Sequence, residues 1–87
     1  MINFIQDELG VWVNTEARLS RLDTIFAIDI QTATSRFNPN LPTRYNVVLD
    51  YGNRVGNRTD VLLKSFDSLT DARKFAAKQA AILNGDD

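Results

Sequence analysis

The chain has 87 residues, with ten Lys and Arg against eleven Asp and Glu, and it contains neither histidine nor cysteine. This length suffices for one small core, so we expect a single domain over residues 1–87. Without imidazoles and thiols, the chain lacks the commonest general base and the usual ligands of zinc and copper. The nearly balanced charge gives no general attraction to nucleic acid or anionic lipid, so any such binding has to be local.

The composition also bears on location. A protein without cysteine gains nothing from an oxidising compartment. The first ten residues, MINFIQDELG, carry acidic residues and lack the basic start of a signal peptide. No apolar run approaches the about 18 residues of a membrane-spanning helix. We therefore expect a cytoplasmic protein that does not associate with a membrane.

Two short alternating segments open the chain. Residues 4–6 (FIQ) and 11–14 (VWVN) are predicted to form a hairpin, in which Gly10 supplies the positive φ of a tight turn. An alternative interpretation makes residues 4–9 a short helix, which Asn3 would cap and Gly10 would end. The hairpin is the preferred prediction.

Side chains of the second segment alternate between two faces. Val11 and Val13 share one face, and Trp12 and Asn14 share the other. Trp12 either closes one edge of the core or is exposed as a contact for a partner. Residues 20–23 (SRLD) follow with the S-x-x-D spacing of a capped turn.

The middle of the chain predicts three further strands. Residues 25–34, 45–51 and 61–66 are rich in β-branched and aromatic side chains and alternate with period two. Residues 36–43 contain two prolines, which lack the N–H donor that a central strand needs, so this segment is a loop. An up-and-down order then places this loop and the 52–60 loop at opposite ends of the sheet.

The last third predicts one helix over residues 68–84. Ser68 is a good N-cap with Asp71 three residues later, and Gly85 can end the helix in a left-handed conformation. The apolar residues that share one helix face are Leu69, Ala72, Phe75, Ala76, Ala80 and Leu83. The predicted fold class is α+β, a small antiparallel meander of four to five strands covered by one C-terminal helix.

The loop sequence GNRVGNR, residues 52–58, raises the question of an anion site. Arg54 and Arg58 stand on a glycine-containing loop, and Arg18 and Arg21 are expected near the same end of the sheet. A glycine-rich loop is specific for phosphate when it leads into a helix N-terminus, whereas this loop leads into a strand. We therefore expect a solvated hairpin tip. Nucleic-acid binding through these four arginines is the alternative hypothesis.

Catalytic candidates are few. Asp29 and Asp50 lie on neighbouring predicted strands, but both are expected on the solvent face, where nothing indicates the cleft that catalysis needs. No calcium-loop spacing occurs in the sequence. We expect no enzymatic activity, no metal and no cofactor.

A surface that binds another protein is the leading functional prediction. Aromatic and arginine side chains dominate interface hot spots, and the candidates are Trp12, Phe37, Tyr45, Arg54 and Arg58. The edge of a small antiparallel sheet can also pair with a strand of a partner or of a second copy. The sequence thus predicts a small non-enzymatic interaction module, such as a subunit, adaptor or inhibitor, whose partner is another protein or itself.

Overall fold

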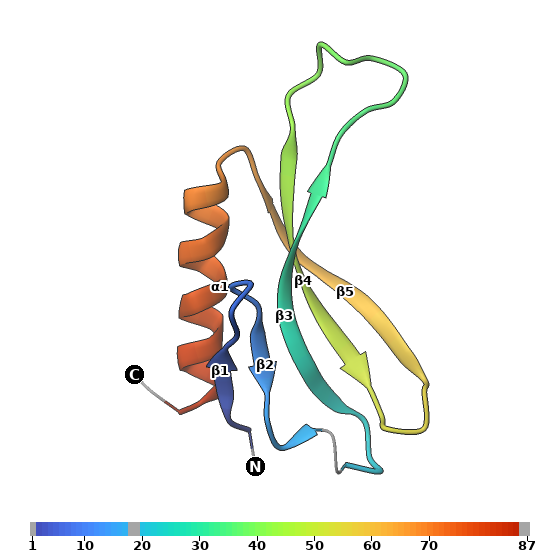
Figure 1. Cartoon of the computed structure of the whole chain (residues 1–87), viewed down its shortest axis with the longest axis vertical. Coiled ribbons are helices and arrows are strands. Elements are labelled where there is room, and N and C mark those ends of the chain that lie inside the picture. The colour runs from blue at the N-terminus through green and yellow to red at the C-terminus, as the bar shows by residue number, and fades with distance from the viewer. Residues whose placement is uncertain (1, 18–19, 86–87) are drawn as a thin grey trace.

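A computed structural model describes residues 2–17 and 20–85 of the chain. Within these residues the chain forms a five-stranded antiparallel sheet whose spatial order equals the chain order, with a helix against one face (Figure 1). The elements are β1 (Phe4–Gln6), β2 (Trp12–Asn14), β3 (Thr24–Ala33), β4 (Arg44–Gly52), β5 (Arg58–Phe66) and α1 (Leu69–Leu83). This architecture confirms the predicted meander covered by a C-terminal helix.

The first two strands form the predicted hairpin and not the alternative short helix. Ile5 lies opposite Val13 in an antiparallel register, and Gly10 has a φ of +86°. The carboxylate of Asp7 accepts hydrogen bonds from the N–H groups of Leu9 and Val11, each at 2.9 Å. The turn therefore satisfies backbone donors that the short strands leave unpaired.

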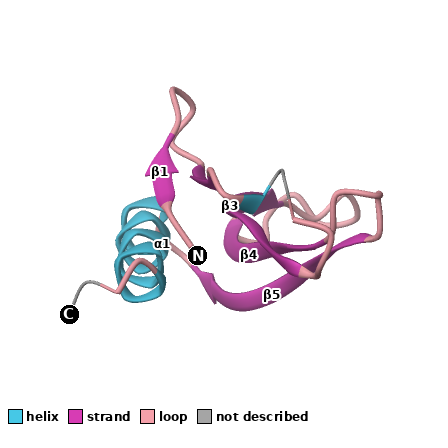
Figure 2. Ribbon diagram, turned by 90° about the horizontal axis from the view of Figure 1, so that it is seen from below, coloured by secondary structure: helices cyan, strands magenta, loops and turns pink. Residues whose placement is uncertain are grey.

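β3, β4 and β5 are much longer than the first two strands and make up most of the sheet. β5 begins at Arg58, three residues before the predicted start, because the connecting turn is short and the ladder already pairs Gly52 with Arg58. The two strands that flank β4 each contain one extra residue relative to it. The extra residues are Phe26 in β3 and Leu63 in β5. Such bulges bend a strand and increase its twist, and β3 to β5 curve away from the helix in Figure 2.

α1 begins and ends where its sequence predicts. The hydroxyl of Ser68 accepts a hydrogen bond from the N–H of Asp71 at 3.4 Å. At the other end, Asn84 is the C-cap and Gly85 follows with a φ of +88°. Ala72, Ala76 and Ala80 are the fully buried residues of the helix, as the apolar stripe predicts.

The core lies between this alanine stripe and one face of the sheet. Small side chains along the middle of the helix allow its backbone to approach the strands closely. The buried cluster consists of Phe4, Ile28, Val47, Ala72, Ala76 and Ala80, and Trp12 and Tyr45 are among the partly buried residues packed against it.

The structure shows which face of β2 is internal. Trp12 and Asn14 lie on the helix side, and Asn14 is buried. The side-chain oxygen of Asn14 accepts from the N–H of Asn3 at 3.1 Å, and its amide group donates to the carbonyl of Ile25 at 2.8 Å. A buried asparagine is stable here because its polar atoms have backbone partners.

The molecule is elongated. Its principal extents are 43, 30 and 21 Å, and its radius of gyration is 14.0 Å, whereas a compact domain of this length has about 12 Å. Figure 1 shows the β3–β4 loop projecting past the start of α1, while the β4–β5 loop lies at the opposite end of the sheet. This confirms the predicted separation of the two loops.

Candidate interaction surface

The glycines of GNRVGNR shape a tight hairpin turn. A Cβ at Gly52 would lie 1.9 Å from the backbone oxygen of Asn57, so only glycine fits this position. The same oxygen accepts a hydrogen bond from the N–H of Asn53 at 3.3 Å. The close approach of the backbone at Gly52 to the backbone at Asn57 explains the first glycine without any ligand.

This loop packs against the preceding turn at residues 20–23. The N–H of Arg54 donates to the carbonyl of Ser20 at 3.2 Å, and the side chain of Asn53 donates to the carboxylate of Asp23 at 2.9 Å. Arg21 is exposed on that turn, so it shares this end of the molecule with Arg54, as expected. Arg18 lies outside the described residues.

The two arginines of the loop have different surroundings. Arg58 donates from Nε to Asp50 at 2.9 Å and from a terminal nitrogen to the second oxygen of the same carboxylate. Its guanidinium also lies 3.8 Å from the centre of the Phe26 ring. Arg54 is exposed, and among the described residues its side chain makes no ion pair.

Hydrogen bonding to Asp50 raises the pKa of Arg58 above its ordinary value, and the charges of Asp50 and Asp60 act in the same direction. Asp50 therefore pairs with this guanidinium, and a second carboxylate, that of Asp60, lies near enough for its charge to act on it. Its planar donor fork, the feature by which arginine recognises phosphate, is already used within the molecule.

The other predicted contact residues do not form one surface. Phe37 is fully exposed on the β3–β4 loop, at the opposite end from Arg54 and Arg58. Trp12 and Tyr45 are half-buried and pack against the core. The structure therefore brings together only the residues of the arginine-bearing end.

The sequence predicted that a sheet edge could pair with another strand but not which edge is open, and the structure identifies β5. This strand is at the edge of the sheet, and its residues from Arg58 to Lys64 are all exposed. They include three consecutive aliphatic side chains, Val61, Leu62 and Leu63, which are 42%, 58% and 37% exposed. Within the described part of the chain, no element lies beyond this edge (Figure 2).

The opposite edge of the sheet, formed by β1, is short and partly covered. β1 has only three residues, and the side chain of Asn84 pairs with its backbone. The oxygen of that amide accepts from the N–H of Phe4 at 2.7 Å, and the nitrogen donates to the carbonyl of Phe4 at 3.1 Å. The helix C-cap thus occupies the β1 edge, whereas the nine-residue β5 edge stays open.

A shallow apolar hollow lies on the sheet face away from the helix. Its volume is about 530 Å³, and its lining residues are Ile5, Val13, Asn14, Thr15, Phe26, Ala27 and Arg58. The Arg58 side chain, which lies over Phe26, forms one wall. The hollow therefore extends from β1 to the Arg58 side chain at the start of β5.

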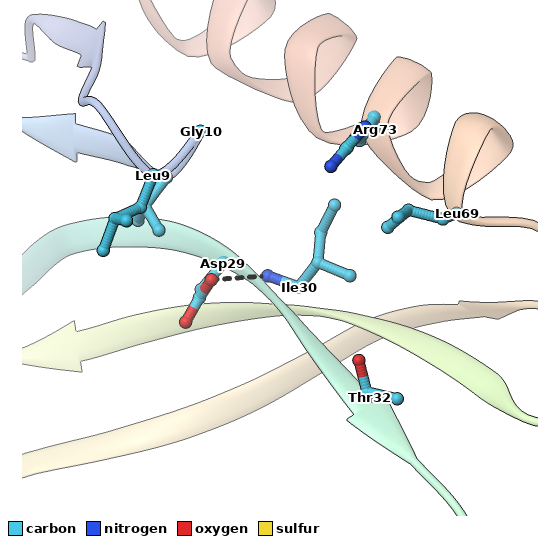
Figure 3. Close-up of a pocket in the computed structure, with 8 residues that line it drawn as sticks. Leu9, Gly10, Asp29, Ile30, Thr32, Leu69 and Arg73 are labelled. Carbon is cyan, nitrogen blue, oxygen red and sulfur yellow. Dashed lines mark hydrogen bonds between the residues drawn. The ribbon is translucent and has the colours of Figure 1, made fainter.

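A smaller hollow of about 130 Å³ lies between the β1–β2 turn, β3 and the first half of α1 (Figure 3). It exists because β2 pairs only with Ala27 and Ile28, so the rest of β3 has no strand on that side. There the carboxylate of Asp29 accepts the N–H of Ile30 at 2.7 Å. The Asp29 carboxylate is thus a hydrogen-bond acceptor for the backbone of its own strand.

Comparison with known proteins gives no match, whether to a family model, to a curated protein or to a solved structure. In residues 2–17 and 20–85, no helix has the length and apolar character needed to cross a membrane. Inference about function therefore rests on the surface of the molecule.

Proposed function

We propose that this protein is a small non-enzymatic interaction module that binds a protein partner by accepting a strand at the β5 edge. The observation that carries the proposal is the exposure of Val61, Leu62 and Leu63 on a long open edge strand. Edge strands in monomeric proteins are usually short, charged or covered, since a free edge pairs readily with another chain. β5 has charged residues toward its ends, but its central run from Val61 to Leu63 is uncharged and uncovered. Strand addition would pair the free backbone groups and cover the aliphatic side chains.

The total exposed area supports the same proposal. The chain exposes 6252 Å², whereas a compact monomer of 9.8 kDa exposes about 5,200 Å². The projecting β3–β4 loop contributes to the difference, and so does the open β5 edge. An excess of about 1,000 Å² is similar to the roughly 800 Å² that one partner buries in an interface of standard size.

The electrostatics favour a protein partner over nucleic acid. Arg58 is paired with Asp50, and Asp23 and Asp60 lie at the same end of the molecule as Arg54. A nucleic-acid site needs a surface of one sign, and this end carries both. A cytoplasmic location belongs to the same proposal and is supported by the absence of cysteine.

Affinity capture from the native lysate tests this function. The wild-type chain is compared with Leu62→Lys on the β5 edge and with Ile82→Lys on α1, two exposed aliphatic positions at 58% and 54%. We expect the wild type and Ile82→Lys to retain a protein that Leu62→Lys loses. Equal capture by all three chains would contradict binding through β5.

A further inference from the structure

We propose that the strand accepted by the β5 edge is β5 of a second copy, paired antiparallel about a two-fold axis at Leu62. This inference rests on the proposed function, because it names the partner of the same edge. It starts from the exposed aliphatic run Val61, Leu62 and Leu63, which lies at the centre of the nine-residue strand. A two-fold axis through that centre places the apolar part of one strand against the apolar part of the other.

The charges of β5 select the position of the axis. An axis at Asp60 would set two carboxylates directly opposite each other, which destabilises a strand pair. An axis at Val61 would set each Asp60 carboxylate opposite the apolar side chain of the partner's Leu62, which is a poor match. At Leu62, the axis sets leucine opposite leucine and keeps like charges apart.

The bulge at Leu63 fixes the neighbouring pairs. Because Leu63 is an extra residue, Leu62 and Lys64 occupy consecutive positions of the ladder. Residues directly opposite each other in a strand pair have their side chains on the same face of the sheet. Val61 therefore lies opposite the partner's Lys64, and Asp60 lies opposite the partner's Ser65. The stem of the lysine can cover valine, and each Asp60 carboxylate then faces a neutral side chain and not a second carboxylate.

The other sheet edge explains why pairing would stop at two chains. A two-fold strand pair uses the β5 edges of both copies. The remaining edges are the two β1 strands, whose Phe4 backbone is already bonded to Asn84. The product is therefore a closed dimer with a continuous sheet and not an open fibre.

Sedimentation analysis of charge-swapped chains tests the dimer and its axis. Wild type is measured from low micromolar to near millimolar concentration, beside Leu62→Lys, Leu62→Glu and the control Ile82→Lys. We expect wild type and Ile82→Lys to dimerise, and each Leu62 variant alone to bind itself at least about tenfold more weakly, through like charges at the axis. An equimolar mixture of Leu62→Lys and Leu62→Glu should restore a dimer, since opposite charges then meet. Circular dichroism of each variant establishes that it is folded, as expected for a change at an exposed position.

Three results would overturn the inference: a wild type that is monomeric throughout, Leu62 variants that dimerise as well as wild type, or a mixture of the two that does not recover. The capture experiment separates this inference from the proposed function. A monomeric wild type that still captures another protein through Leu62 overturns the dimer alone. A wild type that neither dimerises nor captures a protein through Leu62 overturns the proposed function as well.

Discussion

At the scale of single residues, the two arginines of GNRVGNR show how neighbours decide the role of a side chain. Each arginine ends one copy of the sequence GNR, yet of the two only Arg58 contacts a carboxylate and an aromatic ring. Its guanidinium covers Phe26, which is almost fully buried although it is the bulged residue of β3. The interpretation as a solvated hairpin tip fits Arg54, whereas Arg58 contributes to the packing of the sheet.

Replacing these arginines should therefore have unequal effects on stability. Arg58→Ala removes an exposed ion pair and a cation–π contact, so we expect a loss of about 1 kcal/mol. Arg54→Ala should change stability by less than about 0.5 kcal/mol, as is usual for an exposed side chain. Urea unfolding of the two variants measures both values. Equal effects would show that the contacts of Arg58 do not stabilise the fold.

At the scale of elements, the alanine stripe sets how closely α1 approaches the sheet. Ala76 lies in the middle of the stripe and is buried, whereas Ala77 and Ala81 are half-buried at its sides. A larger side chain in the middle of the stripe would have to push the helix away from the sheet.

Ala76→Leu should accordingly destabilise the protein by about 1 to 3 kcal/mol through overpacking. Ala77→Leu and Ala81→Leu add the same atoms at the sides of the stripe, where the leucine can extend toward solvent. They should destabilise the protein clearly less than Ala76→Leu does. Thermal and urea unfolding of the three variants provide the comparison. The same loss at all three positions would mean that the stripe does not limit the helix position.

The pairing of Asn84 with β1 connects the two ends of the chain through one side-chain amide. Asn84→Ala would leave the N–H and the carbonyl of Phe4 without these partners, so we expect a loss of about 1 to 3 kcal/mol. Asn84→Asp keeps the acceptor, loses the donor and places a negative charge at the helix C-terminus, which is unfavourable. Both variants should be less stable than wild type in urea unfolding. A neutral Asn84→Ala would indicate that water replaces the amide at no cost.

At the scale of the whole molecule, an open edge and an elongated shape should link stability to assembly. A dimer that forms only from folded chains stabilises them by mass action. The Tm of wild type should therefore rise with protein concentration, whereas the Tm of Leu62→Lys should not. Differential scanning calorimetry over the concentration range of the sedimentation experiment measures this. A wild-type Tm that is independent of concentration would argue against a dimer near its unfolding temperature.

The sequence by itself determined the elements and their order. The β-branched residues, the turn glycine Gly10, the Ser68 cap and the alanine spacing of α1 act over a few neighbouring residues, so they can be recognised in the chain. The loops at opposite ends of the sheet follow from the same order.

Only the tertiary structure decided which surfaces are open. Val61, Leu62 and Leu63 have the composition of a buried strand, yet they are exposed because β5 has β4 on one side only and, in the described residues, no strand on its outer side. Asn14 is buried, and its amide pairs with backbone groups of Asn3 and Ile25, each 11 residues away along the chain. In each case the deciding contacts, or their absence, involve residues far apart in the sequence, and periodicity does not report such contacts.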